Sequence, residues 1–301
     1  MVRLLALTVL CVLTTARPSG AQEEALDTIL VSGRPVAYHV VGSGQGVPLV
    51  VINGGPGLPH DYLHQSDVWT SLGSSRRVVF FDQPGTGHSW RLGAGDSLAV
   101  SDLTAVIDRL REHLGVDRVA LLGHSFGGFV ALSYAIEYPT RVDRLALVSS
   151  PAATGSDSEF LFEQLWPDSM ARSVGQPALR IGDSLGLTQD IKRHFAMGFY
   201  SPRMRSQVLG RVDSVDFSAD QFLLLYQSIA IDLTASLRGI RVPTLVATGR
   251  FDANVSPRTA WRLREAMPHA SWWVWEESGH YPMIEEPDSF ARVIGTFLSA
   301  P

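Results

Sequence analysis

The chain has 301 residues, of which 45% are hydrophobic and 18% charged, and its formal net charge at pH 7 is −5. This length and composition allow a large hydrophobic core, as one domain or as one domain carrying an insertion. The acidic balance and the lack of a basic run argue against nucleic-acid binding.

The N-terminus has the features of a secretory signal peptide. It starts with the basic Arg3, continues with an apolar run too short to span a bilayer, and reaches small residues at Ser19 and Ala21. We expect residues 1–21 to be removed, which makes the protein secreted or periplasmic with no membrane contact after cleavage; an uncleaved anchor is the alternative. The only cysteine, Cys11, lies in this segment, so the mature chain should have no disulfide.

From residue 29 to 150, short apolar segments alternate with helical patterns. The apolar segments are 35–41, 48–53, 77–82, 118–123 and 144–149, and the helical ones are 101–116, with Ser101 as the expected N-cap, and 125–139. The pattern returns with strands at 242–249 and 270–276 and helices at 256–268 and 287–299. Such alternation predicts an α/β fold, with a mostly parallel central sheet and helices on both faces.

Residues 155–234 lack this alternation and are mostly helical in pattern. A helical insertion between two sheet strands is typical of a lid. The predicted organisation is therefore a signal peptide at 1–21, a core formed by 22–154 and 235–301, and a helical cap at 155–234.

The sequence "LLGHSFGG" places Ser125 in a Gly-x-Ser-x-Gly motif. The bare motif is common, but here a strand leads directly into it and a helix leads directly out. A turn this tight strains the backbone at the serine, the flanking glycines relieve crowding, and the hydroxyl stands at the carboxyl edge of the sheet. Ser125 is thus a candidate nucleophile, and a helix-capping serine is the alternative.

A serine nucleophile needs a histidine base oriented by a carboxylate. His280 follows the last predicted strand in a Ser-Gly-His turn, and Asp252 directly follows the strand at 242–249. Both lie where parallel strands end, in the chain order Ser, Asp, His. The alternatives are a surface histidine and a helix-capping aspartate.

Three further histidines lie near these segments. His124 adjoins Ser125, but neighbours on such a turn point apart, so we expect it to pack behind the site. His60 and His64 have i,i+4 spacing without a third ligand, and no metal site is predicted there.

Taken together, the segments resemble a known family. A strand leads to Gly-Gly-Pro-Gly at 54–57 and "HDYL" at 60–63, and then come "DQPGTGHS" at 82–89, the Ser125 turn, "GRFD" and "SGH". This series resembles the α/β-hydrolase superfamily and, within it, the proline iminopeptidase-like serine peptidases. Three features depart from the iminopeptidase pattern. Asn53 replaces a histidine, and the turn at Ser125 is Gly-His-Ser-Phe-Gly-Gly, a form commoner among esterases and C–C hydrolases. The tail at 278–298 also resembles the broad superfamily more than the iminopeptidases.

The resemblance implies a catalytic triad of Ser125, Asp252 and His280, in agreement with the chain positions. It also implies an oxyanion hole formed by the backbone N–H groups of Gly55 and Phe126. Loss of one such donor typically lowers the rate about 10²–10³-fold. The Gly-rich loop 82–89 is expected to support the loop of Gly55, and Asn53 to brace it through hydrogen bonds.

The expected activity is a secreted aminopeptidase that releases N-terminal proline or similar residues from peptides through an acyl-enzyme. Glu159 and Glu163 in the cap are the candidates to bind the substrate ammonium, with Asp216 and Asp220 as alternatives, whereas Asp232 reads as a helix N-cap. A carboxylester or lactone hydrolase is the second hypothesis and a non-enzymatic binding protein the third. The substrate is a small peptide or ester, and neither a cofactor nor a metal is implied.

Overall fold

The structure is a computed structural model that describes residues 26–64, 66–93, 95–152, 161, 194–209, 217–228 and 232–300. The predicted signal peptide lies outside the described residues, and so does most of the predicted cap. Among the described residues, no helix has both the length and the apolar composition needed to cross a bilayer.

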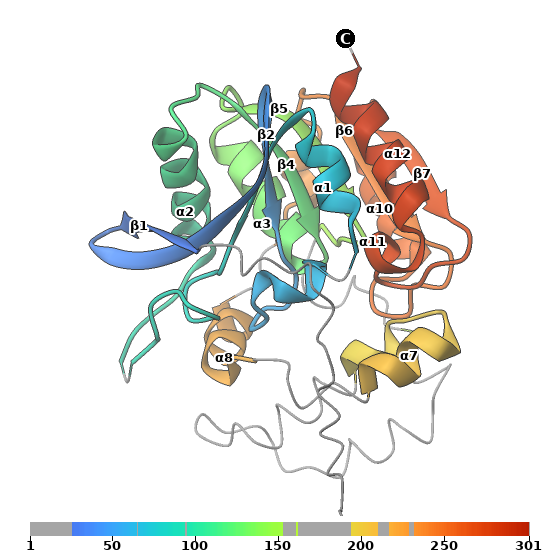
Figure 1. The fold of residues 1–301 in the computed structure, drawn as a ribbon, viewed down its shortest axis with the longest axis horizontal. Helices are drawn as coiled ribbons and strands as arrows, with labels where there is room; N and C mark the ends of the chain where they lie inside the picture. The colour runs from blue at the N-terminus through green and yellow to red at the C-terminus, as the bar shows by residue number, and fades with distance from the viewer. Residues whose placement is uncertain are drawn as a thin grey trace, which may run out of the picture.

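Seven strands in the described part of the chain form one sheet, in the order β1-β2-β4-β5-β6-β7 with β3 paired to β2 (Figure 1). The strands are β1 (Asp27–Val31), β2 (Arg34–Ile52), β3 (Arg76–Phe81), β4 (Val119–His124), β5 (Val142–Val148), β6 (Thr244–Gly249) and β7 (Ser271–Trp275). β2, β4, β5, β6 and β7 are parallel neighbours, and β1 is antiparallel to β2. The predicted mostly parallel sheet is confirmed.

β3 pairs with two separate arms of the long strand β2. Val41 and Leu49 both lie opposite Val78. As β3 continues from Val78 towards Phe81, its partners in the first arm run back from Val41 to Tyr38, so this arm is antiparallel to β3. Its partners in the second arm run forward from Leu49 to Val51, so this arm is parallel to β3. The second arm ends at Ile52 and delivers Asn53 to the carboxyl edge of the sheet.

The central strands end at the same level. Ile52 lies opposite Gly123, His124 opposite Val148, and Val148 opposite Ala247. Because parallel strands present their carboxyl ends at one edge, the loops that follow β2, β4 and β6 converge there.

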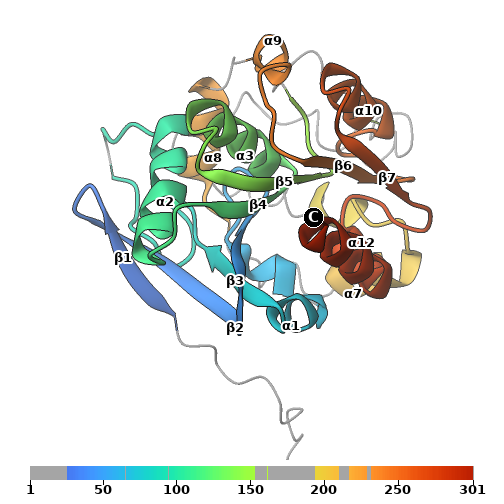
Figure 2. The same cartoon turned by 90° about the horizontal axis from the view of Figure 1, so that it is seen from above.

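Helices cover both faces of the sheet, as Figure 2 shows from above. One face packs against α2 (Val100–His113), α3 (Phe126–Glu137) and α10 (Pro257–Ala266), and the other against α1 (Val68–Gly73) and α12 (Pro287–Ser299). β4 and β6 are buried along their whole length, which explains their continuous apolar sequences. The described residues also form the helices η1 (His60–His64), α7 (Pro202–Leu209), α8 (Ala219–Ser228), α9 (Thr234–Leu237) and α11 (Pro282–Glu285).

One predicted helix start is wrong. α2 begins at Val100 with Ala99 as its N-cap residue, not Ser101. Ala99 is extended, and its N–H donates to the carboxylate of Asp102 at 2.8 Å. This carboxylate thus satisfies the N–H of the N-cap residue, while the Asp102 N–H, which a cap hydroxyl would accept, donates to Ala99 O at 3.0 Å.

The structure also contains elements that the sequence patterns did not predict. β1 is an edge strand with three of its five residues exposed, and η1 and α1 are too short to show a periodicity. Within the predicted cap, the described segments α7 and α8 are helical and lie beyond the lower end of the sheet in Figure 1. The cap as a whole stays a prediction.

Candidate active site

Ser125 occupies the turn between β4 and α3 with a strained backbone. Its φ of 55° and ψ of −126° are rare for a residue with a side chain. The turn is held by hydrogen bonds from Ser125 N–H to Val148 O at 3.0 Å and from Gly128 N–H to Ser125 O at 2.9 Å. This is the conformation that a nucleophile at a strand-to-helix turn requires.

The glycines around Ser125 are needed because neighbouring backbone lies too close for any side chain. A Cβ on Gly127 would lie 2.1 Å from Ile52 O, and one on Gly123 would lie 2.4 Å from Gly128 Cα. The start of α3 can therefore approach β2 and β4 only with glycine at these positions.

Asp252 and His280 are hydrogen-bonded at the same edge of the sheet. His280 Nδ1 lies 2.9 Å and 3.0 Å from the two carboxylate oxygens, and the exposed fractions are 2% for His280 and 0% for Asp252. Asp252 Oδ1 also accepts the N–H groups of Asn254 and Val255, which fixes the carboxylate. Since a carboxylate can only accept, we assign the proton to Nδ1, which leaves Nε2 with its lone pair as the base requires.

Asp252 thus performs a different task from the helix-capping alternative. The N-cap of α10 is Ser256, whose hydroxyl accepts the N–H of Thr259 at 3.2 Å. Asp252 precedes that cap by four residues.

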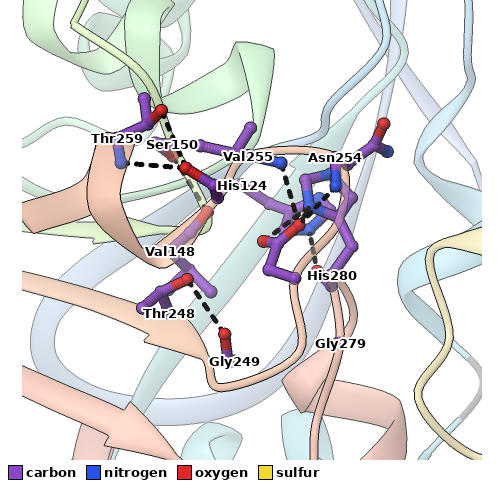
Figure 3. A network of polar contacts seen from close by, with 12 residues as sticks. His124, Val148, Ser150, Thr248, Gly249, Asn254, Val255, Thr259, Gly279 and His280 are labelled. Atoms are coloured by element: carbon purple, nitrogen blue, oxygen red, sulfur yellow. Dashed lines mark hydrogen bonds and ion pairs between the residues drawn. The ribbon is translucent and has the colours of Figure 1, made fainter. Parts of the chain in front are cut away.

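His124 connects the turn of Ser125 to the loop of His280. Its Nε2 lies 2.8 Å from His280 O, and the two imidazole centroids are 4.7 Å apart (Figure 3). Among the described residues, no hydrogen bond joins Ser125 Oγ to the His280 ring, and such bonds often tighten only when substrate binds.

The Gly54–Gly57 loop lies directly against Ser125. A Cβ on Gly54 would come within 2.8 Å of Ser125 Cβ, and Gly55 has a φ of 125°, which favours glycine. The Gly54 N–H donates to Tyr62 OH at 2.6 Å. Within the described residues the N–H groups of Gly55 and Phe126 donate to no partner, so these two donors remain available at the site.

Asn53 braces this loop through its amide donor. Asn53 Nδ2 donates to Gly54 O at 3.1 Å and to Leu58 O. The backbone carbonyl of Asn53 accepts a hydrogen bond from Gln83 Nε2 at 2.8 Å. The side-chain oxygen has no hydrogen-bond partner in the described part of the chain. Of the expected role, the structure therefore shows the hydrogen-bond donor of the Asn53 side chain in use but not its acceptor.

The 82–89 loop lies beside the Gly54–Gly57 loop and is held together by Asp82. Its carboxylate accepts the N–H groups of His60 at 3.2 Å and His88 at 2.9 Å, and its carbonyl accepts Ser89 Oγ at 2.6 Å. Together with the Gln83 bond to Asn53, this geometry is that of a supporting loop.

Gln221 on α8 is a site residue that the sequence did not reveal. Its Oε1 accepts the Gly57 N–H, its Nε2 donates to Pro84 O at 2.6 Å, and the side chain is fully buried. One amide thus joins both glycine-rich loops. A glutamine within a helical pattern carries no local signal for this contact.

Glu285 on α11 is a second residue near the site that the sequence did not reveal. Its carboxylate accepts the N–H groups of Gly279 at 2.7 Å and Ser201 at 2.9 Å, while His280 N–H donates to Gly198 O at 2.7 Å. Burial raises the pKa of Glu285, although these N–H donors oppose the shift. The backbone of His280 is thereby tied to the segment that precedes α7.

Three histidines pack together where η1 meets β2: His60 and His64 belong to η1, and His39 to β2. The ring centroids of His60 and His64 are 5.0 Å apart, those of His39 and His64 5.1 Å, and those of His64 and Phe80 4.2 Å. Burial, followed by the neighbouring His60 and His39, lowers the pKa of His64 to about 3. In the described part of the chain, no set of three or more His, Cys, Asp or Glu side chains is arranged to hold a metal ion.

The two candidates for binding an ammonium group, Glu159 and Glu163, lie outside the described residues, as does Asp216. Asp220 is exposed on α8. The Asp232 carboxylate accepts the Thr234 N–H at 2.8 Å at the start of α9, although Leu233 is the N-cap residue itself.

Residues 47–287 match the sequence pattern of the α/β hydrolase fold. The chain therefore belongs to the α/β-hydrolase family, and the expected fold is confirmed. Within the family it is proline iminopeptidase-like, as the resemblance predicted.

The relatives that support this placement have different activities in their names. A proline iminopeptidase from Clostridium botulinum is 30% identical over 87% of this chain and 94% of its own. A 2-hydroxy-6-oxo-2,4-heptadienoate hydrolase from Pseudomonas putida is 29% identical over 90% and 95%. Among solved structures, the enol-lactonase from Burkholderia xenovorans LB400 superposes with a TM-score of 0.71 at 23% identity, over 91% of this chain and all of its own.

Proposed function

We propose that this α/β hydrolase is a serine hydrolase with Ser125 as nucleophile, His280 as base and Asp252 as the carboxylate that orients it. The observation that carries the proposal is the buried, two-oxygen contact of Asp252 with His280 Nδ1 at the sheet edge where Ser125 stands on its strained turn. A carboxylate in this position holds the imidazole in the required tautomer and stabilises its charged form.

The proposed reaction has two half-reactions. His280 Nε2 takes the Ser125 proton as Oγ attacks the carbonyl carbon, and the resulting oxyanion accepts hydrogen bonds from the N–H groups of Gly55 and Phe126. His280 then returns the proton to the leaving group, which gives an acyl-Ser125 ester. Water hydrolyses this ester by the same steps.

For the substrate, we propose a peptide whose N-terminal proline, or a similar residue, is released. Support comes from the motifs at 54–57, 60–63 and 82–89 and from the similarity to the Clostridium botulinum iminopeptidase. Such a substrate brings a free ammonium group, and we propose Glu159 and Glu163 as its partners.

The first prediction concerns this ammonium group. An ion pair lost on one side costs about 3–5 kcal/mol, so kcat/KM for proline 4-nitroanilide should exceed that for its N-acetyl form more than about 10²-fold. A Ser125→Ala control should lose nearly all turnover of both. A ratio near one would reject aminopeptidase activity while leaving the serine mechanism intact.

A carboxylester or lactone hydrolase is the second candidate, and the Gly-His-Ser-Phe-Gly-Gly turn favours it. Turnover of short acyl esters without turnover of amino-acyl anilides would decide for this activity. Covalent labelling of Ser125 by a fluorophosphonate would dismiss a non-enzymatic binding protein.

We also propose export of the protein, on the strength of the apolar N-terminal segment. The mature chain should begin close to Gln22, and N-terminal sequencing of protein secreted by a bacterial host tests this expectation. A mature chain that still starts at Met1 would favour the uncleaved anchor.

A further inference from the structure

A continuous series of buried hydrogen bonds runs from the Gly54–Gly57 loop to the loop of His280. Gly54 N–H lies 2.6 Å from Tyr62 OH, Tyr62 OH lies 2.7 Å from His124 Nδ1, and His124 Nε2 lies 2.8 Å from His280 O. η1, β4 and the loop after β7 each contribute one member.

The chemistry of the two ends fixes the direction of every bond. A backbone N–H only donates, so Gly54 donates to the Tyr62 oxygen, and a carbonyl only accepts, so His124 carries its proton on Nε2. His124 Nδ1 is then an acceptor, and the Tyr62 O–H donates to it. Each polar atom along the series has a partner suited to one neutral histidine tautomer.

Burial makes any other arrangement costly. The exposed fractions are 7% for Tyr62 and 1% for His124, and a buried donor or acceptor left without a partner costs about 1–3 kcal/mol. Burial and the adjacent His280 keep the pKa of His124 well below its usual value, and burial raises that of Tyr62. Both side chains are therefore neutral at working pH.

The residues that this series joins adjoin or carry the groups that must keep fixed relative positions during catalysis. Gly54 immediately precedes the oxyanion donor Gly55, His124 immediately precedes Ser125, and His280 carries the base. We infer that Tyr62 and His124 form a positioning pair, which sets the oxyanion loop, the nucleophile and the base relative to one another. This inference rests on the proposed serine mechanism.

The pair also serves the charge that develops in the reaction. The His280 ring becomes a cation when it takes the Ser125 proton, and the His124 ring centroid is only 4.7 Å away. A neutral His124 does not repel the positive charge on His280. Tyr62 keeps His124 neutral, because the Tyr62 O–H can donate only to an unprotonated Nδ1.

Four variants test the pair: Tyr62→Phe, His124→Phe, the double variant, and His124→Gln, whose side-chain amide still offers an acceptor and a donor. Removal of one oxyanion donor costs about 10²–10³ in rate, and displacing it indirectly should cost less. With 4-nitrophenyl acetate we expect each Phe variant to lower kcat about 10–100-fold with KM changed less than about threefold. His124→Gln should restore most of kcat, and the double variant should be no slower than the worse single one.

The matched control is Tyr38→Phe, because Tyr38 OH makes a similar 2.8 Å contact with His113 Nε2 away from the site. This variant should keep kcat within about twofold. The inference is overturned if Tyr62→Phe or His124→Phe also keeps kcat within about twofold, or if the double variant shows the product of the single losses. Should Tyr62→Phe fail to fold, equal kcat values for His124→Gln and His124→Phe would by themselves overturn the inference.

The rate of Ser125 labelling by a fluorophosphonate separates this inference from the proposed function. An unlabelled wild-type protein would contradict the serine mechanism. A labelled wild type whose Tyr62→Phe and His124→Phe variants react equally fast would leave the mechanism standing and contradict only the positioning pair.

Discussion

Asn53 stands where the iminopeptidase-like pattern has a histidine, and its buried side chain shows what that position does. Its amide donor holds the carbonyls of Gly54 and Leu58, while its oxygen is unused among the described residues. The position thus requires a hydrogen-bond donor aimed across the turn. An imidazole N–H meets this requirement as well as an amide.

The second prediction follows from that requirement. An Asn53→His variant should fold and keep kcat/KM within about threefold for the best ester substrate. Asn53→Leu, which is similar in size but has no donor, should lower the free energy of unfolding by about 1–3 kcal/mol and reduce kcat. Chemical denaturation and ester kinetics measure both effects. A tenfold rate increase in Asn53→His would mean that the natural loop is poorly placed for catalysis.

Single residues at strand ends could be predicted from the sequence, because their signals are local. Ser125, Asp252 and His280 each directly follow or lie close to an apolar strand, and the structure brings Asp252 and His280 into contact. Tyr62, Gln221 and Glu285 could not be predicted in the same way. Each of them has at least one partner more than 60 residues away in sequence, and only the packing of whole elements determines which distant groups they meet.

Helix α8 is an element whose contacts with distant loops the sequence did not predict. It comes from the stretch predicted as a cap, yet Gln221 bridges Gly57 and Pro84, and Ser218 N–H donates to Gly57 O at 2.7 Å. The aromatic ring of Phe217 also fills the space where a Gly57 side chain would stand. α8, together with Phe217 and Ser218 just before it, is therefore part of the support of the Gly54–Gly57 loop.

The third prediction tests that support. Gln221→Ala leaves the Gly57 N–H and the Pro84 carbonyl without their shared partner, and we expect kcat to fall about tenfold or more through displacement of Gly55. Gln45→Ala is the matched control, because the exposed Gln45 side chain has a single hydrogen bond to the described residues, to Ser43 O at 3.0 Å. Equal kcat values for the two variants would show that α8 does not position the loop.

For the molecule as a whole, His64 couples folding to pH. It lies in η1 and packs on Phe80, beside His39 and His60, so its protonation would place charge beside an apolar core. The pKa of His64 is about 3 in the folded chain and about 6.5 when unfolded. Between these values the unfolded chain binds a proton that the folded chain does not, so stability falls as pH falls.

The fourth prediction is a slope in the free energy of unfolding. Between about pH 6.5 and 5, where ordinary carboxylates stay ionised, His64 should contribute up to about 1.4 kcal/mol per pH unit. His64→Gln should flatten the dependence, whereas His269→Gln, which alters an exposed histidine, should not. Urea unfolding at several pH values measures the slope. An unchanged slope in His64→Gln would show that His64 is not held neutral by the fold.

The register between β5 and β6 has an evolutionary consequence. Val148 lies opposite Ala247, so the two strands are adjacent although residues 149–243 separate them in sequence. The sheet therefore places no demand on the length of that stretch, and insertions or deletions within it need not disturb the scaffold. The bonds of Gln221 limit this freedom, because any replacement must still offer an amide, or an equivalent, to Gly57 and Pro84. Evolution can thus vary the length of this stretch freely, but not the contact that α8 makes with the two glycine-rich loops.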